Sequence, residues 1–274
     1  KAVETGREVK IHIAADTGMC RIGYVPSPEA IEEVKKIAAL PGITMQGIFT
    51  HFSEADIADK EWAHEQHSRF SDFIDALKGA GVTFNIHHCC NSAGTLELPD
   101  FHREMIRPGI IQYGYDASKE VLVTGTKIKP VMSLRCCITH LKTIYEGDCV
   151  GYGRHFTAKG PTKIATLPIG YADGYNRALS SKIDVIVHGV RAHQVGNICM
   201  DQCMIDVSHI PDVKVGDEVV LFGEQGSECV SADEIADTCH TIIHEITCNI
   251  NRRVPRIYVQ NGKIVQRLEY LTQS

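Results

Sequence analysis

The sequence lacks the apolar run that a membrane helix requires. A bilayer-spanning helix takes about 20 mainly apolar residues, and no stretch of the 274 residues has that composition. The opening residues Lys1–Arg7 are polar and do not resemble a secretory signal peptide. We therefore predict no membrane segment within this chain. We expect a cytoplasmic protein, or the cytoplasmic domain of a membrane-bound one.

Basic residues are too few and too dispersed for a nucleic-acid surface. The chain has 28 Lys and Arg against 34 Asp and Glu, which gives a formal net charge of −6. Proteins that bind nucleic acid usually carry a dense basic patch or stripe, and none occurs here. This balance favours a small-molecule partner over nucleic acid.

The cysteines lack the spacing of a disulfide framework or a zinc site. There are eleven, and no CxxC pair is among them. An odd number without framework spacing is typical of reduced thiols. His240, His244 and Cys248 fall on one helical face, but no fourth ligand accompanies them. We therefore interpret them as ordinary packing residues and predict no metal.

The first half of the chain alternates strand and helix patterns, which predicts a parallel sheet. Strands are expected at 9–15, 44–50, 83–88 and 104–106, and helices at 28–40 and 60–79. Ser27 and Pro28 are typical of a helix start, and Pro41-Gly42 of its end. Ligands bind at the edge of such sheets where the strands end. Five polar side chains follow the expected strands: Arg21, His51, Asn91, Ser92 and Arg107.

The second half of the chain predicts a mainly antiparallel β domain. Strands are expected at 127–142, 163–169, 182–188, 190–195, 203–207 and 217–222, with helices only within 231–249. We place the domains at 1–125 and 126–274. The four strand–helix units of the first domain are too few to close a barrel, which needs eight.

One tyrosine in the second half lies between two glycines, in Gly151-Tyr152-Gly153, and a related motif runs from Ile169 to Gly174. Glycine allows tight turns and close approach of a ligand to the backbone. A phenol held there can act as an acid or base if its surroundings lower its pKa. Taken alone, the pattern is more typical of a β-turn with a packed ring.

Eight motifs in order along nearly the whole chain resemble the alanine racemase family of pyridoxal-phosphate enzymes. They are Asp16–Gly23, Thr50–Phe52, Asn91–Ala93, Arg107–Gly109, Gly151–Gly153, Ile169–Gly174, Ile198–Met204 and Arg253–Arg256. The resemblance implies an α/β fold: the second half of a cofactor-binding (β/α)₈ barrel, followed by the β-rich domain. It also implies a head-to-tail homodimer with shared active sites. The family's lysine motif, Lys-Ala-Asn-Ala-Tyr-Gly-His, is absent, so the chain resembles a fragment without the N-terminal half of the barrel.

The resemblance implies an isomerase that interconverts L- and D-alanine through a pyridoxal 5′-phosphate aldimine, supplying D-alanine for peptidoglycan. Two bases act on opposite faces of the substrate: Tyr152, and the lysine that is missing here. Tyr152, His51 and Arg107 form the implied catalytic set, with His88 in support. Arg107 faces the pyridine nitrogen and donates a hydrogen bond to it, because a guanidinium practically never loses its proton.

The same resemblance implies the binding residues. Ser92 and the backbone amides of Gly109 and Ile110 would bind the cofactor phosphate, with His51 and Arg107 also at the cofactor. Glycine and free amides suit an anion site. Arg21 and the amide of Met200 would bind the substrate carboxylate. Tyr171 and Arg177 match the family's access channel.

Three positions depart from the family pattern, and they keep alternatives open. Ala14 replaces a lysine that is often carbamylated, and Asn197 replaces a channel arginine. Arg252 replaces a tyrosine that reaches the cofactor phosphate in many members, and we assign it to the cofactor site. An altered pocket leaves serine as an alternative substrate, as in the serine/alanine racemases of glycopeptide resistance. A non-catalytic fragment without the lysine is the other alternative. A pyridoxal-phosphate decarboxylase of related architecture fits the ordered motifs less well.

Overall fold

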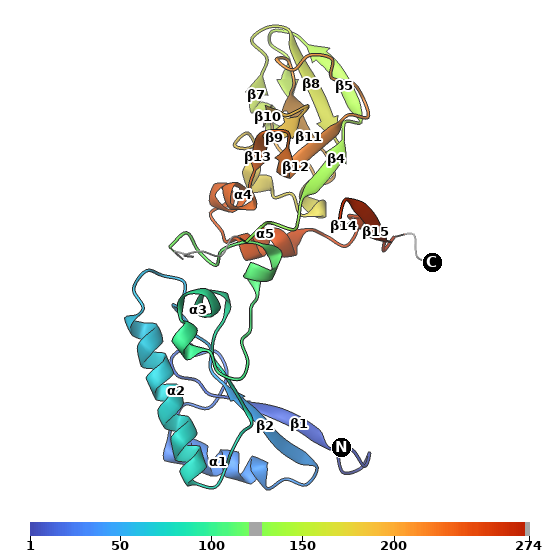
Figure 1. Ribbon diagram of the computed structural model, residues 1–274. Coiled ribbons are helices and arrows are strands. Elements are labelled where there is room, and N and C mark those ends of the chain that lie inside the picture. The colour runs from blue at the N-terminus through green and yellow to red at the C-terminus, as the bar shows by residue number, and fades with distance from the viewer. Residues whose placement is uncertain (121–127, 272–274) are drawn as a thin grey trace. The chain divides into compact units, whose positions relative to one another are not determined.

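The computed structural model describes residues 1–120 and 128–271, and the chain forms two compact units, Lys1–Lys129 and Pro130–Ser274 (Figure 1). Each unit is described by itself. The domain boundary expected at 125–126 lies outside the described residues.

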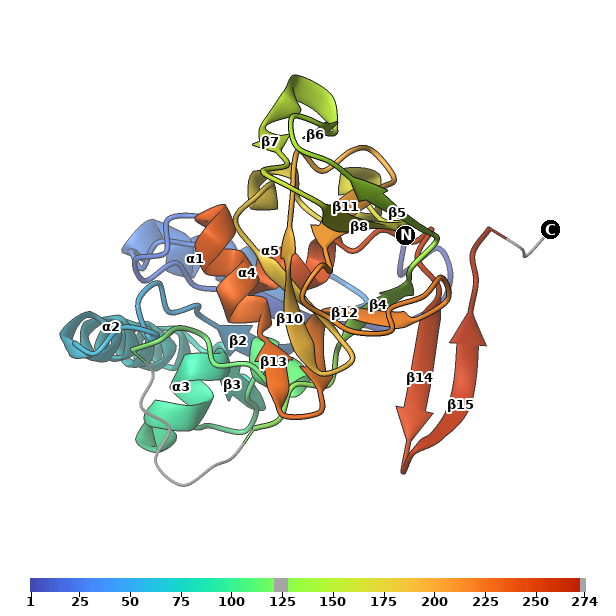
Figure 2. The same ribbon diagram turned by 90° about the horizontal axis from the view of Figure 1, so that it is seen from above.

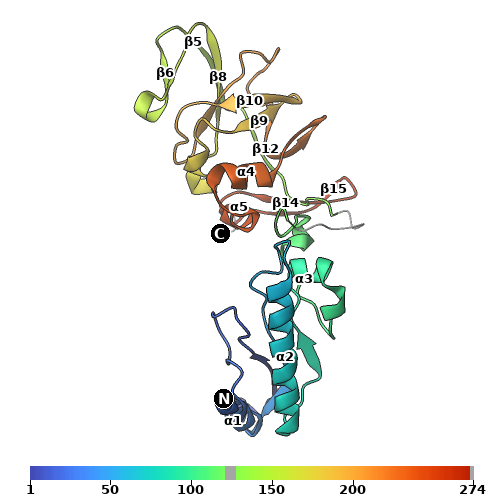
Figure 3. The ribbon, with the colours of Figure 1, turned by 90° about the vertical axis from the view of Figure 1, so that its left-hand side faces the viewer.

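The N-terminal unit is built on three parallel strands in the order β1-β2-β3. They are β1 (Val9–Ala14), β2 (Ile43–Phe49) and β3 (Ile86–His88). The helices are α1 (Pro28–Ala38), α2 (Glu61–Gly79) and the short α3 (Ser92–Glu97), joined by the 3₁₀ turns η1 (Pro99–Phe101) and η2 (Ile110–Tyr113). Figure 3 shows α2 running beside this sheet. Because the strands are parallel, all three end at the same edge of the sheet.

The two long helices follow from local sequence signals. Ser27 caps α1 by accepting a hydrogen bond from the Ala30 amide at 3.1 Å, and Pro28 is the first helical residue. Along α2 the buried residues recur every three or four positions, which places them on one face. That face packs with Ile13 and Ile48 of the sheet in one apolar core. The buried residues of α2 are Ala63, Gln66, Phe70, Phe73 and Leu77.

The prediction of a fourth strand in this unit, at 104–106, is wrong. Residues 104–106 form no strand, and the carboxylate of Glu104 accepts the His87 amide at 2.8 Å. That amide lies on β3, so a side chain occupies a donor that a fourth strand would use. Beyond this stretch, the Arg107 amide donates to the Cys90 carbonyl at 2.9 Å.

The C-terminal unit is a sheet of eight antiparallel strands, in the order β13-β12-β9-β10-β11-β8-β5 with β4 paired to β12. The mainly antiparallel domain expected from the sequence is confirmed. The segment expected as one strand at 127–142 forms two. The strands are β4 (Leu134–Cys137), β5 (His140–Ile144), β8 (Thr162–Leu167), β9 (Asp184–Val187), β10 (Val190–Gln194), β11 (Cys203–Asp206), β12 (Glu218–Gln225) and β13 (Glu228–Val230).

Two small hairpins and two helices complete this unit. The first hairpin is β6 (Cys149–Val150) with β7 (Phe156–Thr157), and the second is β14 (Arg256–Gln260) with β15 (Lys263–Leu268). Figure 2 shows the second hairpin standing clear of the large sheet. The helices are α4 (Ala232–Cys239) and α5 (Ile243–Asn249), and the 3₁₀ turns are η3 (Tyr152–Arg154), η4 (Tyr171–Asp173) and η5 (Arg177–Leu179). No helix among the described residues combines the length and apolarity needed to cross a bilayer.

Candidate active site

Arg107 is the centre of a polar cluster at the edge where β1, β2 and β3 end. Its Nη1 donates to Nδ1 of His88 at 2.5 Å, and its Nη2 donates to the carbonyls of Thr50 at 2.8 Å and Cys89 at 3.2 Å. Its guanidinium carbon lies 5.4 Å from the centre of the Phe49 ring. No carboxylate pairs with Arg107 among residues 1–120 and 128–271. Burial lowers the pKa of Arg107 from its ordinary value, but a guanidinium stays charged near neutrality, so the cluster suits an electron-rich or anionic ligand.

The arginine fixes which histidine nitrogens carry protons. A guanidinium only donates, so Nδ1 of His88 accepts and Nε2 of His88 carries the proton. That Nε2 lies 2.8 Å from Nδ1 of His12, which must therefore accept. Burial, followed by the charge of Arg107, lowers the pKa of His88 to about 4. His88 is therefore neutral at physiological pH and links Arg107 to β1.

His51 follows β2 and is also held neutral. Its Nδ1 lies 3.4 Å from Nη2 of Arg107, so it accepts, and its Nε2 is left to donate. Burial lowers the pKa of His51, and the charges of Arg107 and Arg21 lower it further. Arg21 itself is exposed, and within the described residues no hydrogen bond or ion pair holds its guanidinium. The loop after β1 therefore presents a free cation close to His51.

Ser92 and Gly109 form the second part of this cluster. Asn91 caps α3 by accepting the Gly94 amide at 3.0 Å, which fixes the start of the helix where Ser92 lies. Ser92 is buried, and its Oγ accepts the Gly109 amide at 2.8 Å. Because the oxygen of Ser92 is the acceptor in that bond, its own proton stays available for a ligand. Ile110 comes next and starts η2.

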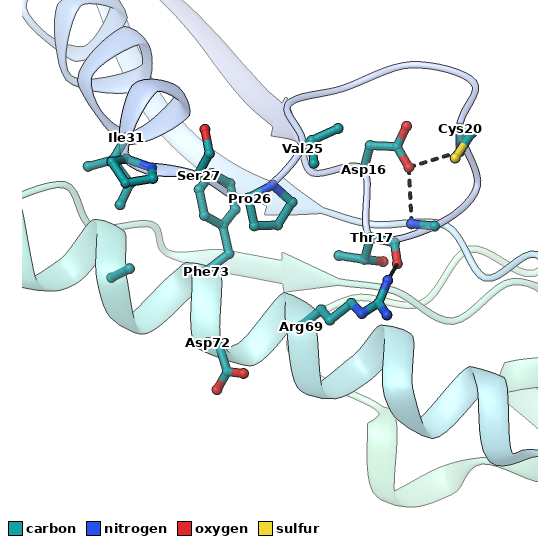
Figure 4. A pocket seen from close by; sticks show the side chains of 13 residues that line it. Asp16, Thr17, Cys20, Val25, Pro26, Ser27, Ile31, Arg69, Asp72 and Phe73 are labelled. Carbon is teal, nitrogen blue, oxygen red and sulfur yellow. Dashed lines mark hydrogen bonds between the residues drawn. The ribbon is translucent and has the colours of Figure 1, made fainter.

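The loop after β1 also borders an apolar cavity of about 580 Å³ between the start of α1 and α2 (Figure 4). Asp16 closes the loop by accepting the amides of Gly18 at 3.1 Å and Cys20 at 2.9 Å. Arg69 of α2 donates to the Thr17 carbonyl at 3.5 Å. None of the predicted site residues lines this cavity, so it is separate from the Arg107 cluster.

Tyr152 lies at the tip of the hairpin β6–β7 in the C-terminal unit. Gly151 and Gly153 have φ angles of 68° and 76°, which favour glycine, and a Cβ at Gly151 would lie 2.9 Å from the Cε atom of Met204. Asn197 donates to the Tyr152 carbonyl at 2.8 Å. Tyr152 is 74% exposed. The two glycines therefore allow the tight turn that carries Tyr152, and Tyr152 is open to solvent in this chain.

The second tyrosine motif is locked by a buried carboxylate. Asp173 accepts the Gly170 amide at 2.9 Å and pairs with Nε of Arg253 at 2.8 Å. Gly174 has a φ of 100°, and a Cβ there would lie 2.2 Å from the Asn249 carbonyl. Asp173 thus joins two of the sequence motifs, and this structural role was not foreseen from the sequence.

Residues 169–174 and 197–204 lie against each other through backbone bonds. The amide of Tyr171 donates to the Cys199 carbonyl at 3.1 Å, and that of Ala172 donates to the Met200 carbonyl at 2.8 Å. Tyr171 and Met200 are both exposed. Tyr152, Tyr171 and Met200 are therefore connected through residues 197–200.

The predicted site residues form two groups, one in each unit. Arg21, His51, Ser92 and Arg107 gather in the N-terminal unit, with Gly109 and Ile110. Arg252 lies elsewhere in the C-terminal unit, where its guanidinium carbon is 5.7 Å from the centre of the Tyr270 ring. His240, His244 and Cys248 form no metal cluster, and no other group of three ligands does so in the described ranges.

Two members of the Arg107 neighbourhood were missed from the sequence. On β1, His12 lies between apolar residues. Because side chains alternate between the two faces of a strand, this pattern indicates that His12 lies on the sheet face opposite the helices. Gln66 is fully buried on the apolar face of α2, between Ala63 and Phe70. A glutamine on an apolar helix face indicates a buried amide with specific hydrogen-bond partners, and this was the signal in the sequence for Gln66.

Comparison with known proteins gives matches in both halves. Residues 1–117 match the family model described as "Alanine racemase, N-terminal domain", and residues 131–258 match "Alanine racemase, C-terminal domain". The sequence is 46% identical over 263 residues to alanine racemase 1 of Clostridium acetobutylicum, covering 96% of this chain and 68% of the relative. It is 47% identical over 271 residues to alanine racemase of Clostridium tetani, covering 98% and 70%.

Solved structures agree with these matches. The alanine racemase of Clostridium difficile 630 superposes with a TM-score of 0.94 at 40% identity, covering 98% of this chain and 70% of that one. The alanine racemase of Bacillus anthracis with bound L-Ala-P superposes with a TM-score of 0.92 at 37% identity, covering 96% and 68%.

Proposed function

Because this chain belongs to the alanine racemase family, we propose that it interconverts L- and D-alanine and so supplies D-alanine for peptidoglycan. The family depends on pyridoxal 5′-phosphate, and its fold is a (β/α)₈ barrel followed by an antiparallel β domain. The single observation that supports the proposal most directly is the state of Arg107. Its guanidinium is part-buried and has no carboxylate partner in the described chain.

The residues present fit the cofactor. Pyridoxal phosphate carries an anionic phosphate and a pyridine nitrogen that can accept a hydrogen bond. The Ser92 hydroxyl keeps a proton for an anion because its oxygen already accepts the Gly109 amide. Arg107 donates but cannot accept. We therefore assign the phosphate to Ser92 and the amides of Gly109 and Ile110, and the ring nitrogen to Arg107. Arg252 is our further candidate at the phosphate.

The bound cofactor supplies an electron sink for the negative charge that develops at Cα of the substrate. Arg107 would reduce the electron-withdrawing capacity of the cofactor ring, since a guanidinium that keeps its own proton leaves the ring nitrogen neutral. His88 reinforces this arrangement because it accepts from Arg107 and is itself neutral at pH 7. The expected consequence is proton transfer at Cα with little side reaction.

Tyr152 is our candidate for one of two bases that move the Cα proton. An ordinary tyrosine has a pKa of about 10, so the phenol needs a donor or a cation beside it. His51 presents a free Nε2–H, and Arg21 presents a free cation. We propose that these groups meet Tyr152 in a head-to-tail homodimer, where one chain contributes the Arg107 cluster and the other contributes the phenol. Arg21 and the Met200 amide would hold the substrate carboxylate, and Tyr171 would line the entrance.

The second base of the proposal is a lysine. Residues 1–274 contain no Lys-Ala-Asn-Ala-Tyr-Gly-His motif, so we propose that this lysine comes from outside them. Without it, the chain is expected to bind the cofactor without racemising alanine, which is the non-catalytic alternative.

The test is racemisation by the full-length protein. D-Alanine formed from L-alanine, and D-serine from L-serine, are each measured with D-amino-acid oxidase. We expect D-alanine to form faster. Faster formation of D-serine would transfer the proposal to serine racemisation. Formation of neither product by protein loaded with pyridoxal phosphate would refute it.

A further inference from the structure

The buried amide of Gln66 holds the backbone on both sides of Phe52. Its Oε1 accepts the Ser53 amide at 2.9 Å, and its Nε2 donates to the His51 carbonyl at 3.2 Å. These two backbone groups also fix the orientation of the Gln66 side-chain amide, because the backbone carbonyl needs a donor and the backbone N–H needs an acceptor. Gln66 is 0% exposed, so water does not compete for either bond.

This pair of bonds has the pattern of a parallel β-ladder. In a parallel sheet, one residue donates to the carbonyl before its partner and accepts from the amide after it. Here Phe52 is the partner, His51 precedes it, and Ser53 follows it. The last residue of β2 is Phe49, so no strand makes these bonds. The planar amide of Gln66 takes the place of one strand residue.

The side chains around this position follow the same pattern. Phe52 is 2% exposed and packs against Phe101, with ring centres 6.1 Å apart. Because side chains alternate along extended backbone, an inward Phe52 directs His51 to the opposite side. That is the side where Arg107 lies 3.4 Å from His51.

The amide also connects the loop that carries Arg21. Nε2 of Gln66 lies 3.5 Å from Oγ1 of Thr17, and Thr17 is 2.7 Å from Oγ1 of Thr50. Thr17 and Thr50 are almost fully buried. On the other side, Ser53 Oγ donates to Oε1 of Gln66 at 3.2 Å and accepts from Nε1 of Trp62 at 2.9 Å. One side chain of α2 thus holds the loops after both β1 and β2.

We propose that Gln66 is a positioning residue for His51, acting as a surrogate strand residue that extends the sheet past the end of β2. The backbone part of this inference is independent of the proposed function. The part that concerns rate rests on the proposed function, because it takes His51 as the partner of the proposed base Tyr152.

Gln66→Met is the direct test, since methionine has nearly the same volume and lacks both hydrogen-bonding groups. Leu77→Ala is the matched control: Leu77 is equally buried on α2 but lies three turns away from the amide. Gln66→Glu is the conservative variant, which keeps an acceptor for the Ser53 amide and loses the donor to the His51 carbonyl.

Amide hydrogen exchange of the full-length protein provides the readout that does not depend on activity. We expect exchange at Ser53 to rise about 10-fold or more in Gln66→Met, and to stay near wild type in Leu77→Ala and Gln66→Glu. The His51 titration, followed by NMR, should move back towards 6.5 in Gln66→Met and stay near wild type in Leu77→Ala, because burial beside Arg107 and Arg21 is what lowers the pKa of His51. Unchanged exchange at Ser53 and an unchanged His51 titration in Gln66→Met would overturn the inference.

Kinetics separate this inference from the proposed function. Gln66→Met should lower kcat about 10- to 100-fold, because the freed loop would misplace His51 and small misplacements of a catalytic group have effects of this size. Leu77→Ala should keep a near-normal kcat. A normal kcat in Gln66→Met with raised Ser53 exchange would overturn the positioning role and leave racemisation intact. A wild-type protein that racemises nothing would refute the proposed function, and the exchange result at Ser53 would still decide the backbone inference.

Discussion

His88 makes the N-terminal unit sensitive to acid. The side chain is 4% exposed, and it accepts from Arg107 and donates to His12. A proton added to His88 would have to occupy Nδ1, the atom that faces a guanidinium nitrogen at 2.5 Å. Burial and the charges of Arg107, His12 and His87 all oppose this, and they lower the pKa of His88 to about 4.

The sign of the effect on stability follows from the two pKa values. Unfolded, His88 binds a proton below about pH 6.5, whereas folded it does so only below about pH 4. The unfolded state therefore binds more protons between these values, and the free energy of unfolding falls as the pH is lowered through this window. The interval corresponds to about 3 kcal/mol for this one group. Above pH 6.5 the contribution is constant.

Urea unfolding at a series of pH values measures this directly. Trp62 is the only tryptophan in the chain and lies on α2 of the N-terminal unit, so its fluorescence reports on the unit that contains His88. The variant His88→Gln keeps an acceptor for Arg107 and a donor for His12, and it cannot titrate. His209→Gln, in the C-terminal unit, is the control.

We expect wild type and His209→Gln to lose about 3 kcal/mol more than His88→Gln between pH 7 and pH 4. His67, whose pKa burial and the charge of Arg103 also lower to about 4, contributes equally to all three proteins and cancels in the difference. Parallel stability profiles for wild type and His88→Gln would refute the reasoning about this histidine.

Three further substitutions test other parts of the structure. Asp173→Asn should lower the stability of the C-terminal unit by about 2–3 kcal/mol, because a buried charge-assisted bond to the Gly170 amide and the pair with Arg253 are lost; thermal melting checks this, and an unchanged Tm would contradict it. Gly174→Ala should abolish soluble expression, since its Cβ would lie 2.2 Å from a backbone carbonyl at a φ of 100°; a soluble protein with a normal circular dichroism spectrum would show the loop to be more tolerant. Arg107→Lys should weaken binding of pyridoxal phosphate about 10-fold or more, because an ammonium cannot contact His88 and the Thr50 carbonyl together; equilibrium dialysis measures this, and wild-type affinity would contradict the assignment of Arg107.

Much of the fold follows from local sequence signals. The helix expected at 28–40 forms at Pro28–Ala38 because Ser27, Pro28 and the Pro41-Gly42 pair act locally. The strands expected at 9–15 and 44–50 form at Val9–Ala14 and Ile43–Phe49. Their polar successors also gather as expected, since parallel strands end at one edge of a sheet.

Other features depended on contacts that are distant in sequence. Residues 104–106 have the composition of a strand, but Glu104 bonds to the His87 amide with its side chain. The helical segment 231–249 is divided because His240 adopts a φ of 54° and ends α4. The hairpin β14–β15 was not predicted, although Asn261 and Gly262, both with positive φ, form the turn pair most typical of tight hairpins.

The candidate site shows the same division. His51 and Ser92 could be named from the sequence because each follows a strand. Arg107 could be named from its motif, Arg107–Gly109, although the strand expected before it at 104–106 does not form. For Gln66 the sequence offers only its place on an apolar helix face, since its role depends on a helix placing one amide beside backbone groups 13 and 15 positions away in sequence. The neutral states of His51 and His88 also required the structure, because burial and the neighbouring Arg107 determine them.

Solvent-deuterium exchange at Cα of alanine, catalysed by the full-length protein and its Tyr152→Phe variant, tests the central claim most directly. If Tyr152 is one of two bases, the wild type exchanges the proton of both enantiomers, and Tyr152→Phe loses exchange with one enantiomer far more than with the other. Equal rates for both enantiomers in Tyr152→Phe, at the wild-type level, would contradict the account.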